Sequence, residues 1–299
     1  MKRHTLFTNI TNKKDTSKKI KQSIKTLKKE EQLEELIIAF NNSLFVLCNK
    51  CVKKSRINYS LYSKEIFNHF LNQENVNSPL PNYIIHQSEM DWPMRTALVA
   101  WILEIHKKLS LAHETFFLCI NLIDRFLSLR SVKPESLQLI GLTSLMISCK
   151  YEEVICLSLD TFNNISKKIS GKDILLAEGY ILHSLKSNVE FVNPIHFLKL
   201  FCHCSCKNDL LFKVCHFVLV RLYLDEVFIK YSSSVKATCA YFLGTKILNE
   251  PFTLILNEKT KVCVDECVQM MKLPLANRGI IQFCEESEVF DVVEKFFMK

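Results

Sequence analysis

Two stretches decide the fold of this chain: HETFFLCINLIDRFLSLR at residues 113–130 and LQLIGLTSLMISCK at residues 137–150. Each is long enough for a helix and is apolar on almost every side. Helices of this kind lie in the middle of a helical domain, where other helices surround them. In the second stretch Gly141, Ser144 and Ser148 recur at helical spacing, so neighbouring helices can approach it closely. The sequence therefore predicts an all-α core with residues 137–150 at its centre.

Further helical segments flank this core on both sides. Apolar side chains recur every three or four residues in MRTALVAWILEIHKKL, residues 94–109. The segment KDILLAEGYILHSLK, residues 172–186, closes a first domain that we place at residues 56–192 and that includes a preceding helix. A second helical domain, residues 193–299, begins at NPIHFLKLF with a proline suited to a first turn. Its other helices are predicted at 209–224, 232–248 and 259–272, so each domain should hold about five helices. The small residues Ser234, Ala237 and Ala240 mark 232–248 as the most buried of these.

The composition agrees with an all-helical fold. The 299 residues are 48% hydrophobic, which is enough for sizeable cores. With only 5 glycines and 7 prolines, the chain has little material for the turns of an all-β fold or for a loop that cradles phosphates.

No window approaches the roughly 18 apolar residues of a membrane span, and the first 30 residues lack the apolar stretch of a secretory signal. We therefore expect a soluble protein of the nucleus and cytoplasm, without a membrane partner. Its 13 cysteines are then expected to be reduced.

The net charge of +8 is concentrated at the N-terminus. Residues 1–29 hold ten Lys or Arg against Asp15 alone, a charge of +9, so the other 270 residues sum to −1. We interpret residues 1–55 as a basic and largely flexible extension, in which residues 20–40 could form a helix. Such an arm can stay solvated or can bind nucleic acid or an import receptor. No direct binding of nucleic acid by the body of the chain is expected.

Motifs for catalysis are weak. The sequence has no glycine-rich phosphate loop, no nucleophile elbow and no HExxH motif. Glu152 and Glu153 are adjacent carboxylates, but neighbours on a helix point about 100° apart and cannot flank one bond. We therefore expect a non-catalytic protein with no cofactor.

Cysteine-rich stretches raise the question of a zinc site. FCHCSC at residues 201–206, with Cys215 and His216, offers ligands of the right kind. Structural zinc favours Cys pairs on turns, however, and on a continuing helix Cys204 would point away from its neighbours. CNKC at residues 48–51 lacks a second pair at suitable spacing. We expect packed or surface thiols and no metal.

The chain resembles a known family in five motifs. They occur in the order and spacing of the N-terminal cyclin box: MRTALVAWI at 94–102, NLIDRFLS at 121–128, LQLIG at 137–141, KYEE at 150–153 and AEGYIL at 177–182. The flanking segments PNYIIHQSEM and NPIHFL are similar to the mitotic B-type group. The resemblance extends over residues 56–275, strongly in the first half and weakly in the second, and it implies tandem cyclin-box helical domains.

The resemblance implies roles for charged residues. Arg95 is expected to pair with Asp124 inside the helix bundle, where a bidentate guanidinium–carboxylate contact fixes helix register. Lys150 and Glu178 match the residues by which cyclins hold a cyclin-dependent protein kinase. We assign Glu152 and Glu153 to the same kinase-binding surface. The alternative for this cluster is a surface ion pair that contributes about 0–1 kcal/mol.

A substrate-docking patch is implied as well, for substrates with a basic-x-leucine motif. Its apolar members should be exposed, although the spacing also fits core residues. Family members often carry a larger aliphatic residue at the position of Ala97 and an acid at that of Ala100, so we expect a shallower or altered groove. The matching residues are Met94, Leu98, Trp101, Glu104 and Gln138.

Two further features concern turnover and the fit of the kinase. RHTLFTNITN at residues 3–12 resembles the destruction box of mitotic cyclins, with Arg3 and Leu6 in the leading places, and it suggests recognition by ubiquitin-ligase machinery. The segment VICLSLDTF after KYEE and Ser187 after the fifth helix both depart from the family pattern. Contact with the kinase is therefore expected to be weaker or differently shaped.

The function implied by the resemblance is that of a regulatory subunit that binds and activates a cyclin-dependent serine/threonine kinase in the cell cycle. The alternative is a transcription-associated cyclin, or a general transcription factor of the same fold.

Overall fold

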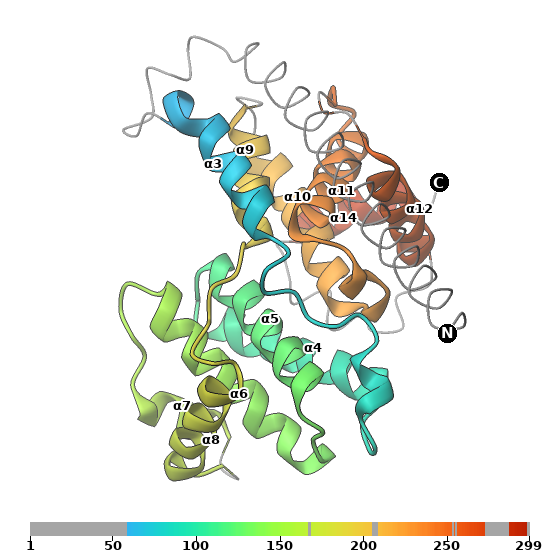
Figure 1. Ribbon diagram of the computed structural model, residues 1–299. Coiled ribbons are helices and arrows are strands. Elements are labelled where there is room, and N and C mark those ends of the chain that lie inside the picture. The colour runs from blue at the N-terminus through green and yellow to red at the C-terminus, as the bar shows by residue number, and fades with distance from the viewer. Residues whose placement is uncertain are drawn as a thin grey trace, which may run out of the picture.

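The structure is a computed structural model, and it describes residues 59–166, 169–204, 209–252, 254, 256–272 and 287–297. Helices and short connections make up these residues, without a strand among them (Figure 1). The prediction of an all-α fold with two helical domains is confirmed. The basic N-terminal extension, the expected helix at 20–40 and the CNKC motif lie outside the described residues. No helix in the described part of the chain is long and apolar enough to cross a membrane.

The N-terminal domain contains α4 (Trp92–Lys108), α5 (His113–Leu129), α6 (Pro134–Glu152), α7 (Leu159–Ile165) and α8 (Gly171–Ser184). Helix α6 packs against α4, α5 and α8, which is the central place predicted for residues 137–150. Its small residues Gly141, Ser144 and Ser148 are buried. A Cβ atom at Gly141 would lie 2.7 Å from Cδ1 of Leu98, so α4 and α6 approach each other closely where the side chain is missing.

Local sequence signals set where these helices begin. The carboxylate of Asp91 accepts a hydrogen bond from the Met94 amide at the start of α4 (2.9 Å), and Pro93 follows in the first turn. Ser170 and Asp173 form a capping box at the start of α8. Helix α5 begins differently, because its N-cap residue, Ala112, has no side-chain acceptor.

The C-terminal domain contains α9 (Pro194–Cys204), α10 (Asp209–Leu224), the 3-10 helix η2 (Glu226–Lys230), α11 (Ser233–Ile247), α12 (Glu258–Lys272) and α14 (Ser287–Phe297). Helix α11 packs against α9, α10 and α12 and is buried along almost its whole length. The small residues Ser234, Ala237 and Ala240 that marked it in the sequence are all buried. At Gly244 a Cβ atom would lie 2.3 Å from Sγ of Cys215 on α10, which shows how closely these two helices pack.

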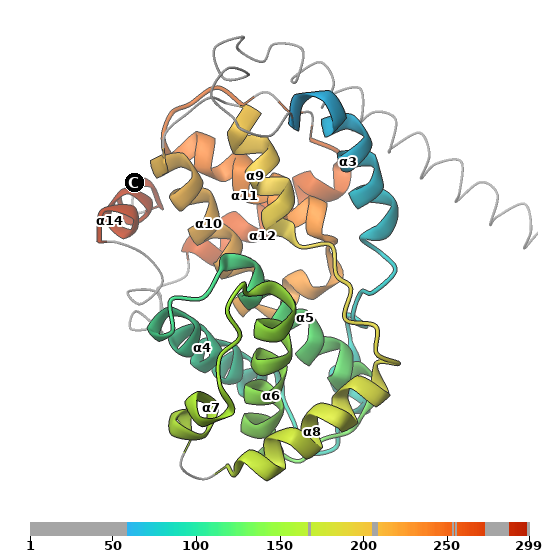
Figure 2. The ribbon, with the colours of Figure 1, turned by 90° about the vertical axis from the view of Figure 1, so that its left-hand side faces the viewer.

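Helix α3 (Tyr59–Gln73) precedes the N-terminal domain in the sequence but packs on the C-terminal domain. Phe67 is buried, and its ring contacts Phe197 edge-on at 5.7 Å between centroids. Phe70 also meets Phe197 and stacks on His196. Both views show α3 beside α9 and away from the α4–α8 group (Figures 1 and 2). The segment after α3 then carries the chain across to the N-terminal domain.

Candidate functional site

Lys150 and Glu178 lie together on the surface of the N-terminal domain. Lys150 is in the last turn of α6, and Glu178 is in the middle of α8, which packs beside α6. The Nζ atom of Lys150 donates to Oε1 of Glu178 at 2.6 Å. The Lys150 side chain is 46% exposed and that of Glu178 is 16% exposed. The structure thus brings the two predicted residues together as an ion pair that solvent or a partner can reach.

The two following glutamates have different surroundings. Oε1 of Glu153 accepts from the amide of Ala112 at 2.8 Å and from the hydroxyl of Thr115 at 2.5 Å. Glu153 therefore caps the start of α5, where Ala112 cannot. Glu152 is half-buried, and burial, followed by the nearby charges of Glu114 and Glu153, raises the pKa of its carboxyl. The kinase-binding role assigned to both residues stays a prediction. Glu153 already has a role within the chain, as the cap of α5.

Exposed apolar side chains accompany the ion pair, and two of them belong to the segment VICLSLDTF that departs from the family pattern. Val154 and Ile155, directly after α6, are 100% and 81% exposed. Leu175 is half exposed and lies three residues before Glu178, on the same side of α8. Neighbouring exposed apolar groups mark interaction sites on soluble proteins. We call Lys150, Glu178, Val154, Ile155 and Leu175 the α6–α8 surface.

Arg95 and Asp124 form the expected buried pair. Nε of Arg95 donates to Oδ1 of Asp124 and Nη2 donates to Oδ2, each at 2.8 Å, so the contact is bidentate. The hydroxyl of Tyr83 adds a third hydrogen bond to Oδ1 at 2.9 Å. Arg95 is 1% exposed, and burial, helped by the Asp124 carboxylate, raises the pKa of Tyr83. Each oxygen of the buried carboxylate therefore has at least one donor.

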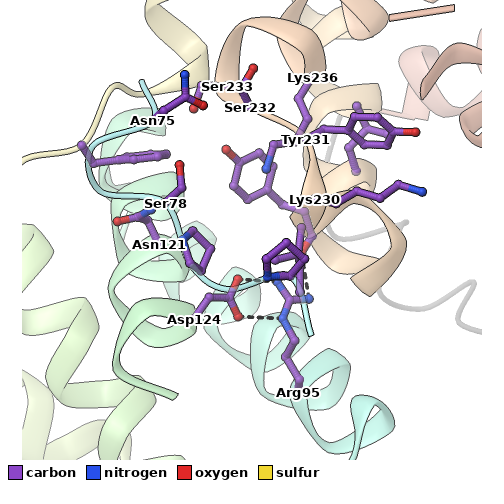
Figure 3. A pocket seen from close by; sticks show the side chains of 16 residues that line it. Asn75, Ser78, Arg95, Asn121, Asp124, Lys230, Tyr231, Ser232, Ser233 and Lys236 are labelled. Atoms are coloured by element: carbon purple, nitrogen blue, oxygen red, sulfur yellow. Dashed lines mark hydrogen bonds and ion pairs between the residues drawn. The ribbon is translucent and has the colours of Figure 1, made fainter. Parts of the chain in front are cut away.

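Arg95 also joins the two domains, which the sequence did not indicate. Its Nη1 atom donates to the main-chain oxygens of Tyr223 at 3.2 Å and Leu224 at 3.3 Å, at the C-terminal end of α10. The hydroxyl of Thr96 donates to the oxygen of Leu224 as well. Figure 3 shows the guanidinium of Arg95 beside Asp124 at the edge of a pocket between the domains. A cation at the end of α10 also interacts favourably with its helix dipole.

The expected docking patch is only partly exposed. Met94 is 37% exposed, Gln138 is exposed, and Trp101 and Glu104 are half-buried. The expectation that Leu98 is exposed is wrong, because it is 6% exposed and packs on Gly141. Leu98 lies so close to Gly141 that a Cβ atom at this position would collide with it. Ala97 is exposed and Ala100 is buried, so a larger residue at position 97 would change the outer surface.

The remaining predicted sites are mostly outside the described residues. Arg3 and Leu6 lie there, as do Cys206 and the side chain of Cys204. Cys202 and Cys215 are buried thiols, and burial, followed by the contact with Cys202, raises the pKa of Cys215. Within the described residues, His, Cys, Asp and Glu form no group of three or more arranged to hold a metal ion.

Comparison with known proteins agrees with the fold. Residues 65–190 match the family model described as "Cyclin, N-terminal domain", and residues 192–283 match "Cyclin, C-terminal domain". This chain belongs to the cyclin family. The division between the two matches falls just before α9 of this cyclin.

Relatives with curated names are mitotic cyclins. The chain is 35% identical to the G2/mitotic-specific cyclin-B of Emericella nidulans over 189 residues, which is 63% of this chain and 40% of that protein. It is 35% identical to the G2/mitotic-specific cyclin cig1 of Schizosaccharomyces pombe over 188 residues, 62% of this chain and 45% of that one. This cyclin thus spans less than half the length of these relatives. It resembles the B-type group, as its motifs predicted.

A solved structure supports the same architecture. The X-ray structure of a viral cyclin from Herpesvirus saimiri superposes with a TM-score of 0.58 at 17% identity, covering 78% of this chain and 97% of the viral one. At this level of identity the similarity concerns the fold of tandem cyclin domains.

Proposed function

We propose that this cyclin is the non-catalytic regulatory subunit of a cyclin-dependent serine/threonine protein kinase and activates that kinase in cell-cycle control. The observation that carries the proposal is the α6–α8 surface, on which an accessible ion pair is accompanied by exposed apolar side chains. The names of the relatives, which are G2/mitotic-specific cyclins, support the cell-cycle assignment.

The chemistry of the α6–α8 surface suits a contact with main-chain groups. The ammonium of Lys150 has three N–H donors, and the carboxylate of Glu178 has two acceptor oxygens. In the free chain one N–H donor of Lys150 and one oxygen of Glu178 form a hydrogen bond with each other. The rest can hold carbonyls and amides of a kinase segment, while Val154, Ile155 and Leu175 offer apolar area to bury. Holding such a segment in one conformation shifts the kinase toward its active state.

Charge reversal tests this contact. Lys150→Glu and Glu178→Lys should each leave kinase groups unpaired at about 1–3 kcal/mol apiece. Kinase binding should then fall about tenfold or more, since 1.4 kcal/mol is a factor of ten. The fold should survive, because an exposed pair contributes about 0–1 kcal/mol to stability. The measurements are co-purification of kinase with the tagged cyclin, phosphorylation of a short peptide and circular dichroism.

The double variant separates a partner contact from a simple surface pair. Reversing both charges restores the ion pair within the cyclin, but it does not reverse the kinase groups, so we expect no rescue of binding. Lys230→Glu is the matched control, because Lys230 forms a similarly exposed pair with Glu266 at 2.7 Å on the other domain. Full kinase binding by either single variant, or rescue by the double variant, would contradict the assignment.

We extend the proposal to substrate docking on α4 and α6. Met94 and Trp101 would contact the leucine of a basic-x-leucine motif, and Glu104 would attract its basic residue, with Gln138 at the edge. Leu98 supports this surface from below. The exposure of Met94 supports this placement, and the exposed Ala97 favours a shallow groove.

The N-terminal segment completes the proposal. Arg3 and Leu6 would act as a degradation signal read by ubiquitin-ligase machinery, and the cyclin would act in the nucleus and cytoplasm. Arg3→Ala with Leu6→Ala should lengthen the half-life of the protein at mitotic exit, as measured after synthesis is blocked. An abundance that stays level through the cell cycle, with retention of a promoter complex, would favour the transcription-associated alternative.

A further inference from the structure

A pocket of about 220 Å³ lies at the junction of the two domains. The segment after α3, α4, α5, the end of α10 and the start of α11 all contribute to its lining. Figure 3 shows Lys236 reaching from α11 into this space, opposite Asn121 and Asp124 on α5. A single water occupies about 30 Å³ in the liquid, so the pocket has room for a group of several heavy atoms.

Lys236 is the unusual residue of this pocket. It is only 8% exposed, and its Nζ atom lies 4.0 Å from the centroid of the Tyr223 ring. Within the described residues the ammonium has no carboxylate partner and no hydrogen-bond acceptor, although the ring face stabilises its charge. A buried charge without such partners is costly unless a ligand supplies them.

A second buried donor faces the same space. The hydroxyl of Tyr223, which lines the pocket, makes no well-formed hydrogen bond within the described residues, although the hydroxyl of Ser233 is close enough to act on its pKa in the lowering direction. Burial raises its pKa, so the hydroxyl keeps its proton and can donate it to an acceptor. An ammonium and a phenol O–H are thus both available, and the ring contact places Lys236 against the same tyrosine.

The charges around the pocket select the ligand. Arg95 is neutralised by Asp124, and Lys230 is paired with Glu266 outside the pocket. Lys236 remains as one uncompensated positive charge. A dianion such as phosphate would exceed this charge and would lie near the carboxylate of Asp124, whereas a carboxylate balances it and can accept from both donors.

We propose that this pocket binds a carboxylate group, held by Lys236 and Tyr223. The group could belong to a free small acid or to the side chain of an acidic peptide, since both present the same two oxygens. This inference is independent of the kinase contact, because none of the residues of the α6–α8 surface lines the pocket.

The environment of Lys236 makes its protonation part of the test. The pKa of Lys236 is lowered to about 8, chiefly by burial; the charge of Arg95 acts in the same direction, and Asp124, Cys263 and Glu74 act in the opposite direction. Glu74 already accepts hydrogen bonds from the amide and hydroxyl of Ser234 at the start of α11. A bound carboxylate favours the charged form, so it should raise this pKa, and its affinity should fall as the pH rises from about 8 through the raised pKa.

The experiment uses the full chain with sodium propionate against sodium chloride at equal ionic strength. Propionate should raise the melting temperature of the parent in a saturable way, because a ligand that binds only the folded state stabilises it. The pKa of Lys236 can be followed by NMR in a chain whose lysines carry ¹³C at Cε. Propionate should raise this pKa by about one unit if it binds the charged form of Lys236 about tenfold more tightly than the neutral form. Phosphate at the same concentration should raise the melting temperature less than propionate does.

Matched variants decide the outcome. Lys236→Met keeps the size of the side chain and should abolish the propionate response, and Tyr223→Phe should weaken it about tenfold. Lys230→Met changes a lysine at the edge of the same pocket and should leave the response intact. If an acidic tripeptide raises the melting temperature at tenfold lower concentration than propionate, the natural ligand is an acidic side chain of a polypeptide. If propionate is effective at the lower concentration, the ligand is a free small acid. No response in the parent, an equal response in Lys236→Met, or a stronger response to phosphate would overturn the proposal.

Discussion

Arg95→Ala should destabilise the whole cyclin, because one side chain both pairs with Asp124 and fastens α10 to the N-terminal domain. Removing one partner of a buried ion pair costs about 3–5 kcal/mol. The oxygen of Tyr223 loses its donor from Arg95, which adds about 1 kcal/mol, while the oxygen of Leu224 keeps the Thr96 hydroxyl. Asp124 retains only Tyr83. The sum, about 4–6 kcal/mol, is a large share of the usual stability of a domain.

Urea denaturation followed by circular dichroism measures this cost, with two variants for comparison. Arg95→Lys keeps the charge but loses the bidentate contact, so it should fall between the parent and Arg95→Ala. Thr96→Ala removes only the hydroxyl bond to Leu224 and should cost about 1 kcal/mol. A loss below 1 kcal/mol in Arg95→Ala would refute the argument. Because the contact joins the domains, we also expect a shallower, less cooperative transition in that variant.

Three other predictions follow from particular side chains. Met94→Ala with Trp101→Ala should weaken phosphorylation of substrates with a basic-x-leucine motif, by about 2 kcal/mol in docking, and spare short peptides without it; equal loss for both substrates would show that these residues are core. Burial lowers the pKa of His106 to about 4, so the folded state holds this ring neutral. The stability that comes from holding His106 neutral is complete above pH 6.5 and is lost as the pH falls toward 4. His106→Gln removes the titrating group, so the loss of stability between pH 7 and pH 4.5, measured by thermal unfolding, should be smaller than in the parent by up to about 3 kcal/mol. Gly244→Ala should destabilise the protein by about 1–3 kcal/mol because the new Cβ would meet Cys215, whereas Gly179→Ala on α8, with no atom within 4 Å, should stabilise it by about 0.5–1 kcal/mol; similar melting temperatures for the two would contradict the packing between α10 and α11.

The sequence predicted the features that repeat along one element. The small residues of 137–150 and of 232–248 marked the two central helices, because close packing requires small side chains at helical spacing. The resemblance to cyclins then identified Lys150, Glu178, Arg95 and Asp124, which the structure brings together in pairs.

Contacts between distant elements could not be predicted in this way. Arg95 binds main-chain oxygens 128 and 129 positions away, and a carbonyl acceptor leaves no mark on the residue type. Leu98 was expected at the surface because it matches a residue of the cyclin docking patch, although its spacing on α4 also fits core residues. In the structure it packs on Gly141 of α6, a contact between helices that its spacing does not indicate. Lys236 was visible within an apolar segment, but the pocket that it enters is formed by six separate parts of the chain, from residues 75–81 to residues 229–236.

The position of α3 has a consequence for synthesis on the ribosome. Its apolar residues Phe67 and Leu71 are buried in the finished protein, but the α9 residue Phe197 is made 130 positions later than Phe67. At about 5–20 residues per second, α3 waits for roughly 6–26 s while the whole N-terminal domain is made and can fold. During that interval the apolar face of α3 is exposed to other nascent chains and to chaperones. A stalled or truncated product that ends before α9 would therefore carry α3 with its apolar face uncovered, next to a complete N-terminal domain. We expect cells to degrade such fragments quickly.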